Sequence, residues 1–169
     1  MTGLPATGKS VIADVVAGAL SAPIFSVDPL EATLLRLGIR REQHSDLAAY
    51  DLAYTLAASQ LRLGQSAVID AVNGYPPVQV AWAELAAQHS VPFVVIATVC
   101  TDPELHRARA SSRDRNIEGF IYEPSWSDIE HMRSSWYVPF PNPDIVLDDV
   151  EPPEVNRNRV LGLLNARRT

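Results

Sequence analysis

Residues 3–10 read Gly3-Leu4-Pro5-Ala6-Thr7-Gly8-Lys9-Ser10 and match the pattern G-x-x-x-x-G-K-[ST] at every fixed position. The two glycines allow a backbone that turns successive amide N–H groups toward one anion. A helix predicted to begin at Lys9 adds the positive end of its dipole to the same anion. An ordinary glycine-rich turn is the alternative, but the segment is better explained as a loop that binds nucleotide phosphates.

Two side chains of this loop have a direct chemical role. The ammonium of Lys9 can reach the β and γ phosphates, and the hydroxyl of Ser10 is a typical Mg²⁺ ligand. We therefore expect ATP and Mg²⁺ as the cofactors, with Lys9 also acting in catalysis. The predicted nucleotide-binding residues are Gly3, Leu4, Pro5, Ala6, Thr7, Gly8, Lys9, Ser10 and Val11.

The basic residues are almost all arginines. Lysine and arginine together number 14, and Lys9 is the only lysine among them. An excess of arginine usually reflects base composition and says little about function. In a chain that otherwise avoids lysine, however, the one exception lies inside the phosphate-binding pattern.

Length and composition indicate one soluble domain over residues 1–169. The chain is 47% hydrophobic and 20% charged, which is ordinary for a globular protein. Its net charge of −6 disfavours nucleic acids and anionic membranes as partners, because both attract broad basic surfaces. A small phosphorylated ligand is still compatible with a local arginine cluster.

The remaining bulk features predict a cytoplasmic protein. Cys100 is the only cysteine, so no intramolecular disulfide can form and a cysteine-based zinc site lacks ligands. No apolar run reaches the roughly 18 residues of a membrane span, and no secretory signal is expected. The sequence leaves the oligomeric state open, including a homodimer.

Helical and extended patterns alternate along the chain. Helices are predicted over 9–20, 45–63, 78–88, 102–113, 127–136 and 155–166, and strands over 24–27, 67–69, 93–99 and 145–147. Such alternation favours parallel strands in a three-layer α/β fold, a P-loop NTPase fold with helices on both faces of the sheet. Only two residues precede Gly3, so we expect the first strand to be truncated.

Two carboxylates are predicted to follow strands at the same sheet edge as the loop. Asp28 ends the run 24–27 and could activate or orient an attacking hydroxyl, although capping of a following helix is an equal alternative. Asp70 ends the next strand in the manner of a Walker B acid that holds Mg²⁺, so we assign Ser10 and Asp70 to the metal. Asn73 could serve only the turn with Gly74.

An arginine-rich segment is the candidate lid, over about 103–124. Arg109 and Arg113 are four residues apart and would share one helix face over the transferring phosphate. The alternative is a solvated basic helix face, which would also explain Arg107 and Arg115. We interpret His106 as a structural or surface histidine and not as a catalytic base. Three residues on successive turns of the helix predicted over 45–63 could face an acceptor: Tyr50, Asp51 and Tyr54.

The segments GLPATGKS, SVDP, AVIDA and CTDPELHRARASSR together resemble a family of small bacterial P-loop kinases, described as predicted ATP-binding kinases. These are related to chloramphenicol phosphotransferase, zeta toxins and the kinase half of polynucleotide kinase. The resemblance implies ATP as donor, Asp28 as the acceptor-activating carboxylate, Arg109 and Arg113 at lid positions, and a parallel five-stranded core. The chain differs from the family pattern in two respects: the first strand is missing, and there is no arginine between Asn73 and Glu84.

These observations lead to a hypothesis of Mg²⁺-dependent phosphoryl transfer to a hydroxyl of a small molecule. The resemblance leaves the acceptor open, because the family acts on antibiotics, sugars, sugar nucleotides and nucleic-acid ends. One alternative is a nucleotide-binding switch that transfers nothing to a metabolite. Another is a 5′-hydroxyl nucleic-acid kinase, which the acidic charge disfavours.

Overall fold

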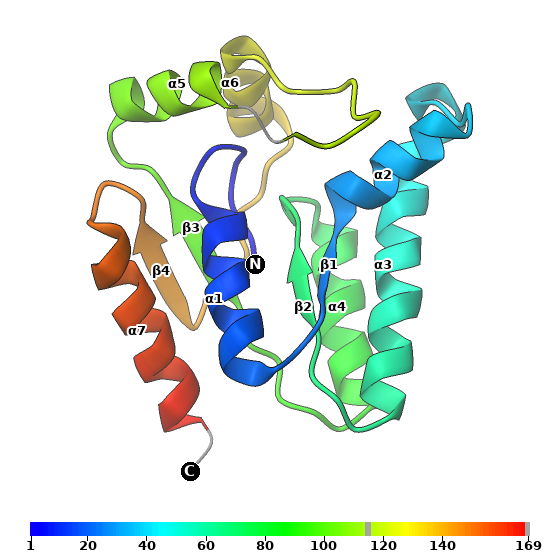
Figure 1. The fold of residues 1–169 in the computed structure, drawn as a ribbon, viewed down its shortest axis with the longest axis vertical. Helices are drawn as coiled ribbons and strands as arrows, with labels where there is room; N and C mark the ends of the chain where they lie inside the picture. Colours follow the sequence, from blue (N-terminus) through cyan, green and yellow to red (C-terminus); the bar gives the residue numbers. More distant parts are fainter. Residues whose placement is uncertain (114–115, 168–169) are drawn as a thin grey trace.

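The computed structural model describes residues 1–113 and 116–167, and it shows an α/β fold with helices on both sides of parallel strands (Figure 1). The strands are β1 Ile24–Ser26, β2 Val68–Asp70, β3 Ile96–Val99 and β4 Ile145–Asp148. The helices are α1 Lys9–Leu20, α2 Val27–Arg36, α3 Ser45–Arg62, α4 Pro76–Gln88, α5 Pro103–Ser112, α6 Trp126–Ser135 and α7 Pro153–Ala166, with a 3₁₀ turn at Arg41–Gln43.

The sheet consists of two parallel pairs joined by the first residues of the chain. β1 pairs with β2, and β3 pairs with β4. Between them, Thr2 forms a parallel bridge with Ala97, and its amide donates to the Ile96 carbonyl at 3.0 Å. On the other side, the amide of Gly3 donates to the Val72 carbonyl at 3.2 Å. Residues 1–3 thus lie between the two pairs of strands. In the place of the expected first strand, the structure has the single bridge between Thr2 and Ala97.

Two apolar clusters, one on each face, make the three layers. One cluster joins α1 and α7 to the strands through Ile12, Val16, Ile96, Leu147 and Val160. The other packs α3 and α4 against the opposite side, where small alanines at every fourth position of α3 allow close approach to Trp82; these are Ala49, Ala53 and Ala57. The predicted fold class is confirmed.

Two elements differ from the sequence prediction. The helix α2 was considered only as a helix that Asp28 could cap, and its bounds were not predicted; Val27, Glu31 and Leu35 form the buried i, i+4 stripe that fixes it against the core. The strand predicted over 93–99 begins only at Ile96, because the amide of Val95 donates to the side chain of Asp144 at 2.6 Å instead of to a neighbouring strand. The described part of the chain contains no helix with the length and apolar character of a membrane span.

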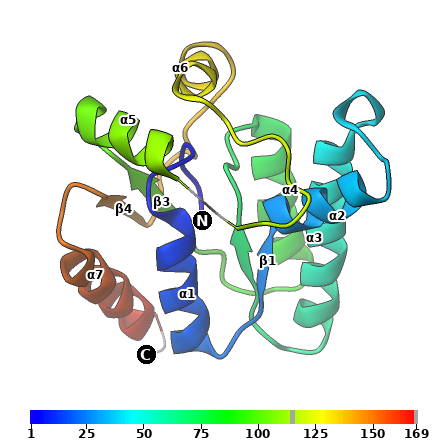
Figure 2. The same ribbon diagram turned by 45° about the horizontal axis from the view of Figure 1, so that its top comes forward.

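The parallel arrangement gathers functional groups at one edge. The carboxyl ends of β1 and β2 and the start of α1 meet at this edge, as expected where ligands bind in open α/β sheets. In Figure 2, α5 and α6 lie above the loop that precedes α1. The edge is therefore covered by the segment predicted as a lid.

Candidate active site

Both glycines of the phosphate-binding loop are required by geometry. Gly3 has φ 147°, and a Cβ there would lie 2.3 Å from the carbonyl oxygen of Thr98. Gly8 caps α1 at φ 80°, and a Cβ would lie 2.9 Å from Oδ1 of Asp149. Any other residue would clash with its neighbour in a backbone conformation that L side chains rarely adopt. Tertiary packing therefore reinforces the glycine pattern that the motif predicts.

The loop folds around its own side chains. The hydroxyl of Thr7 donates to the Leu4 carbonyl at 2.8 Å and lies 2.7 Å from the hydroxyl of Thr98. Lys9 is 7% exposed, and its Nζ donates to the same Leu4 carbonyl at 2.7 Å. The ammonium of the only lysine is thus held on the inside of the loop. This is the position from which it can meet phosphate oxygens.

Ser10 and Asp70 meet directly, as predicted for a metal site. The hydroxyl of Ser10 donates to Oδ2 of Asp70 at 2.7 Å, and that of Ser26 lies at 3.4 Å from the same oxygen. Oδ1 of Asp70 is buried without a hydrogen-bond partner in the described chain. A hydroxyl and a carboxylate with one unsatisfied oxygen fit the oxygen-only chemistry that Mg²⁺ prefers. The pair is therefore suited to hold the ion of a nucleotide complex.

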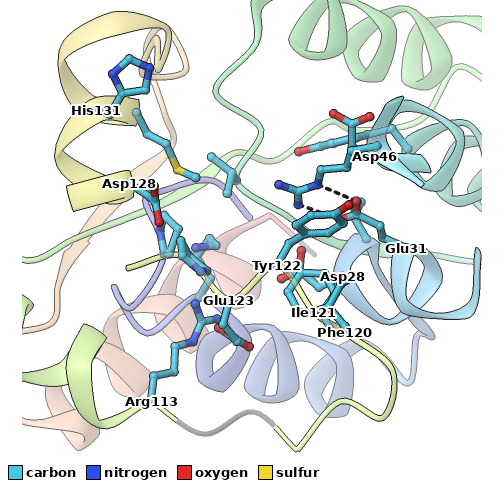
Figure 3. Close-up of a pocket in the computed structure, with 18 of the residues that line it drawn as sticks. Asp28, Glu31, Asp46, Arg113, Phe120, Ile121, Tyr122, Glu123, Asp128 and His131 are labelled. Carbon is cyan, nitrogen blue, oxygen red and sulfur yellow. Dashed lines mark hydrogen bonds and ion pairs between the residues drawn. The ribbon is translucent and has the colours of Figure 1, made fainter. Parts of the chain in front are cut away.

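A cavity of about 460 Å³ opens beside the loop. Lys9 and Asp28 both line it, from the loop and from α2. In Figure 3, Asp28, Glu31 and Asp46 lie on one side of the cavity, and Asp128 and His131 lie on the other. The cavity is large enough for a small molecule.

Asp28 occupies a different local structure from the one predicted. It lies in the first turn of α2, not at the end of a strand, because the helix begins at Val27 directly after β1. The capping alternative is also wrong, since Ser26 is the cap residue and no side chain caps this helix. Asp28 nevertheless faces the cavity at the predicted sheet edge.

The two lid arginines separate instead of sharing a helix face. α5 ends at Ser112, and Arg113 has extended backbone angles of φ −69° and ψ 119°. Arg113 lines the cavity, whereas Arg109 forms an ion pair with Asp149 and donates to its carbonyl at 2.8 Å. The predicted common face is therefore wrong, and Arg115 lies outside the described residues.

Sequence reasoning missed a second polar group on the cavity wall. Arg41 donates to Glu31 through Nε at 2.8 Å and through Nη2 at 3.0 Å, and the hydroxyl of Ser45 donates to Glu31 at 3.0 Å. Tyr122 places its ring 4.1 Å from the guanidinium carbon. These residues form no short sequence motif. The one signal in the sequence is Glu31, a charged residue within the otherwise apolar stripe of α2.

The tyrosines of α3 also differ from one another. The Oη of Tyr50 accepts from the Asn73 amide at 3.3 Å and lines the cavity. Burial raises the pKa of this phenol well above its ordinary value, so the hydroxyl keeps its proton. Tyr54 instead packs on Trp82, with 5.8 Å between ring centroids, and Asp51 is exposed. Tyr50 is the one member of the set that faces the cavity.

Asn73 has the structural role that its turn position suggested. Its φ is 48°, and its side chain donates to the Met1 carbonyl at 2.7 Å and accepts from the indole of Trp82 at 2.9 Å. It therefore ties the central segment of the sheet to α4.

His106 connects the lid to the phosphate-binding loop, in agreement with a structural role. It is 1% exposed; Nε2 lies 2.8 Å from the Pro5 carbonyl, and Nδ1 lies 3.0 Å from Nη2 of Arg133. Because arginine can only donate, Nδ1 is the acceptor and Nε2 carries the proton that Pro5 accepts. Burial lowers the pKa of this imidazole below its ordinary value, so the neutral form is the folded form.

We predict that His106 makes the protein less stable in mild acid. A lowered folded pKa means that the unfolded chain binds the proton more readily, so this stability is present above the ordinary pKa of about 6.5 and is lost as the pH falls. Urea unfolding at pH 7.5 and 5.5 should show a larger loss for the native chain than for His106→Gln. Equal losses in the two proteins would contradict the prediction.

Comparisons with known proteins agree with this geometry. A family described as AAA domain matches residues 1–136. No curated protein sequence matches the chain. The fold is that of a proposed kinase from Chloroflexus aurantiacus, with a TM-score of 0.73, 22% identity, and coverage of 95% of this chain and 94% of that one.

Two further crystal structures share the fold. The APS kinase of Mycobacterium tuberculosis, in complex with AMPPNP and APS, has a TM-score of 0.66 and 18% identity, covering 97% of this chain and 94% of that one. A sugar kinase from Janibacter sp. HTCC2649 has a TM-score of 0.67 and 19% identity, covering 97% and 91%. The architecture is therefore that of the small P-loop kinases.

Proposed function

We propose that this chain, which belongs to the AAA domain family matched by its residues 1–136, transfers the terminal phosphoryl group of ATP to a hydroxyl of a small-molecule acceptor with Mg²⁺. One observation carries the proposal: Lys9, on the phosphate side, and Asp28, on the acceptor side, line the same cavity. A nucleotide-binding switch that transfers nothing to a metabolite has no need of a carboxylate at the acceptor position. Both groups required for transfer are thus present within one small volume.

The proposed reaction uses each group in a separate role. Asp28 accepts or orients the proton of the acceptor hydroxyl, while a bond forms between that oxygen and the γ-phosphorus and the bond to the departing ADP oxygen breaks. Lys9 and Arg113 balance the charge on the transferring group. Ser10 and Asp70 would hold Mg²⁺, which supplies charge neutralisation between the phosphates when bound.

Arg109 fits this scheme only with a rearrangement. Its ion pair with Asp149 lies beside Gly8, because Asp149 is also the residue that a Cβ at Gly8 would meet. This pair must open before Arg109 can contact a phosphate. Until then Arg109 joins α5 to the segment after β4, which itself lies against Gly8.

Two measurements test the proposal. Calorimetry with Mg-AMPPNP should show one binding site that disappears with EDTA. Incubation with γ-labelled ATP, Mg²⁺ and a pool of small metabolites should yield a labelled product that is not free phosphate. Nucleotide binding without a labelled metabolite would favour a switch, and absence of nucleotide binding by the folded chain would end the proposal.

A further inference from the structure

The guanidinium of Arg41 has unused hydrogen-bonding capacity toward the cavity. Of its five N–H donors, two point at the carboxylate of Glu31. Within residues 1–113 and 116–167, Nη1 makes no hydrogen bond. Arg41 lines the same cavity as Asp28, and its side chain is 41% exposed. A bound molecule in the cavity would therefore find unfilled donors at this position.

The surroundings hold Arg41 in one orientation. Glu31 is 2% exposed and takes three hydrogen bonds, two from Arg41 and one from Ser45. Tyr122 belongs to the segment between α5 and α6, and its ring centroid lies 4.1 Å from the guanidinium carbon. A fork held by a carboxylate on one side and an aromatic ring on another is preorganised, so little entropy is lost when it binds a ligand.

We propose, on the basis of the proposed function, that Arg41 binds the acceptor and that the acceptor is an uncharged polyhydroxylated molecule of sugar size. Glu31 is its positioning residue, and Tyr122 covers the bound acceptor from the lid.

The charge of the cavity selects the class of acceptor. Five carboxylates line it against three cationic side chains. Lys9 belongs to the phosphate-binding loop, and Glu31 already compensates Arg41. An anionic acceptor would therefore meet surplus negative charge from residues such as Asp46, whereas uncharged hydroxyls can donate to carboxylates and accept from Arg41.

Neutral donors and aromatic rings complete this match. The protonated phenol of Tyr50 lines the wall beside Asp28 and is both a donor and an acceptor. The aromatic side chains of Phe120, Tyr122 and Trp136 contribute apolar surface to the same cavity. A mostly apolar wall with a few directed polar groups is the usual design of a small-molecule site, and here the polar groups suit several hydroxyls at once.

An acceptor panel tests the class. ADP release at saturating Mg-ATP would be measured with D-glucose, D-galactose, D-ribose and myo-inositol, and with the anionic counterparts D-glucuronate and D-glucose 6-phosphate. We expect at least one neutral compound to be phosphorylated, with kcat/KM about tenfold or more above that of either anionic compound. Preference for an anion, or no turnover of any neutral compound by protein that binds Mg-AMPPNP, would overturn the acceptor class and leave the kinase proposal standing.

Arg41→Lys tests the residue itself. Lysine keeps a positive charge beside the buried Glu31, so folding is preserved, but it lacks the fork. The KM for the best acceptor should rise on the order of tenfold to a hundredfold, as expected for loss of charge-assisted hydrogen bonds, while the KM for ATP stays unchanged. Arg62→Lys, at the far end of α3 and outside the cavity, is the matched control. An unchanged acceptor KM in Arg41→Lys would overturn the assignment of Arg41. If the native protein did not bind Mg-AMPPNP, the proposed function itself would be refuted.

Discussion

Asp28→Asn is expected to lower kcat by about 10²- to 10⁴-fold, the range associated with loss of a general base, with almost no change in the affinity for Mg-AMPPNP. The amide has the shape of the carboxylate but cannot take the proton of an attacking hydroxyl. Asp28 lies in the first turn of α2, in a different element from the loop that is proposed to hold the phosphates. The loss should therefore fall on turnover and spare nucleotide binding.

Steady-state kinetics with the best acceptor, paired with calorimetry, provide the check. Asp51→Asn is the matched control, because Asp51 is an exposed carboxylate one helix residue away from Tyr50 and does not line the cavity. It should retain native kcat. If Asp28→Asn also retained native kcat, Asp28 would have no part in activating the acceptor.

Lys9→Ala is expected to weaken both nucleotide binding and turnover, each by roughly tenfold to a hundredfold or more, because a charge-assisted contact to phosphate is lost. In the structure Lys9 is 7% exposed, and its ammonium donates to the Leu4 carbonyl at 2.7 Å. No other lysine exists in the sequence to replace it. We expect an arginine to replace it only in part, since a planar guanidinium presents its donors in a different geometry from a compact ammonium.

Calorimetry with Mg-AMPPNP and single-turnover kinetics measure the two losses. Thermal unfolding of the variant without nucleotide separates them from a folding defect. Lys9→Arg retains the charge and should recover only part of the binding. Native affinity in well-folded Lys9→Ala would show that the amides of the loop bind the nucleotide without the ammonium.

Local sequence patterns were sufficient to predict the phosphate-binding loop and the contact of Ser10 with Asp70. The loop was predictable because its glycines, ammonium and hydroxyl occupy eight consecutive residues, and each local conformation serves the same anion. The partnership of Ser10 with Asp70 also followed from the sequence, since parallel strands bring their carboxyl ends to one edge. Asp28 was placed at the correct edge but in the wrong element, because β1 has only three residues before the helix begins.

The lid shows the limit of helical spacing. Four residues separate Arg109 from Arg113, and a continuous helix would align them. The helix ends at Ser112, however, and Asp149, forty residues further along the chain, takes Arg109 as its partner. The residue spacing within one segment cannot reveal a competing contact with a distant segment of the chain.

The sequence by itself determined the fold class and the phosphate-binding chemistry, because both arise from periodicity and from contiguous residues. Tertiary structure alone decided the part of the cavity wall that we propose binds the acceptor, where Glu31, Arg41 and Tyr122 come from α2, the 3₁₀ turn and the segment before α6. More than 80 residues separate the last two along the chain, so no local pattern encodes their contact. It exists because packing of α2 against α3 and closure of the segment before α6 bring a charge, its counter-charge and an aromatic ring to one cavity.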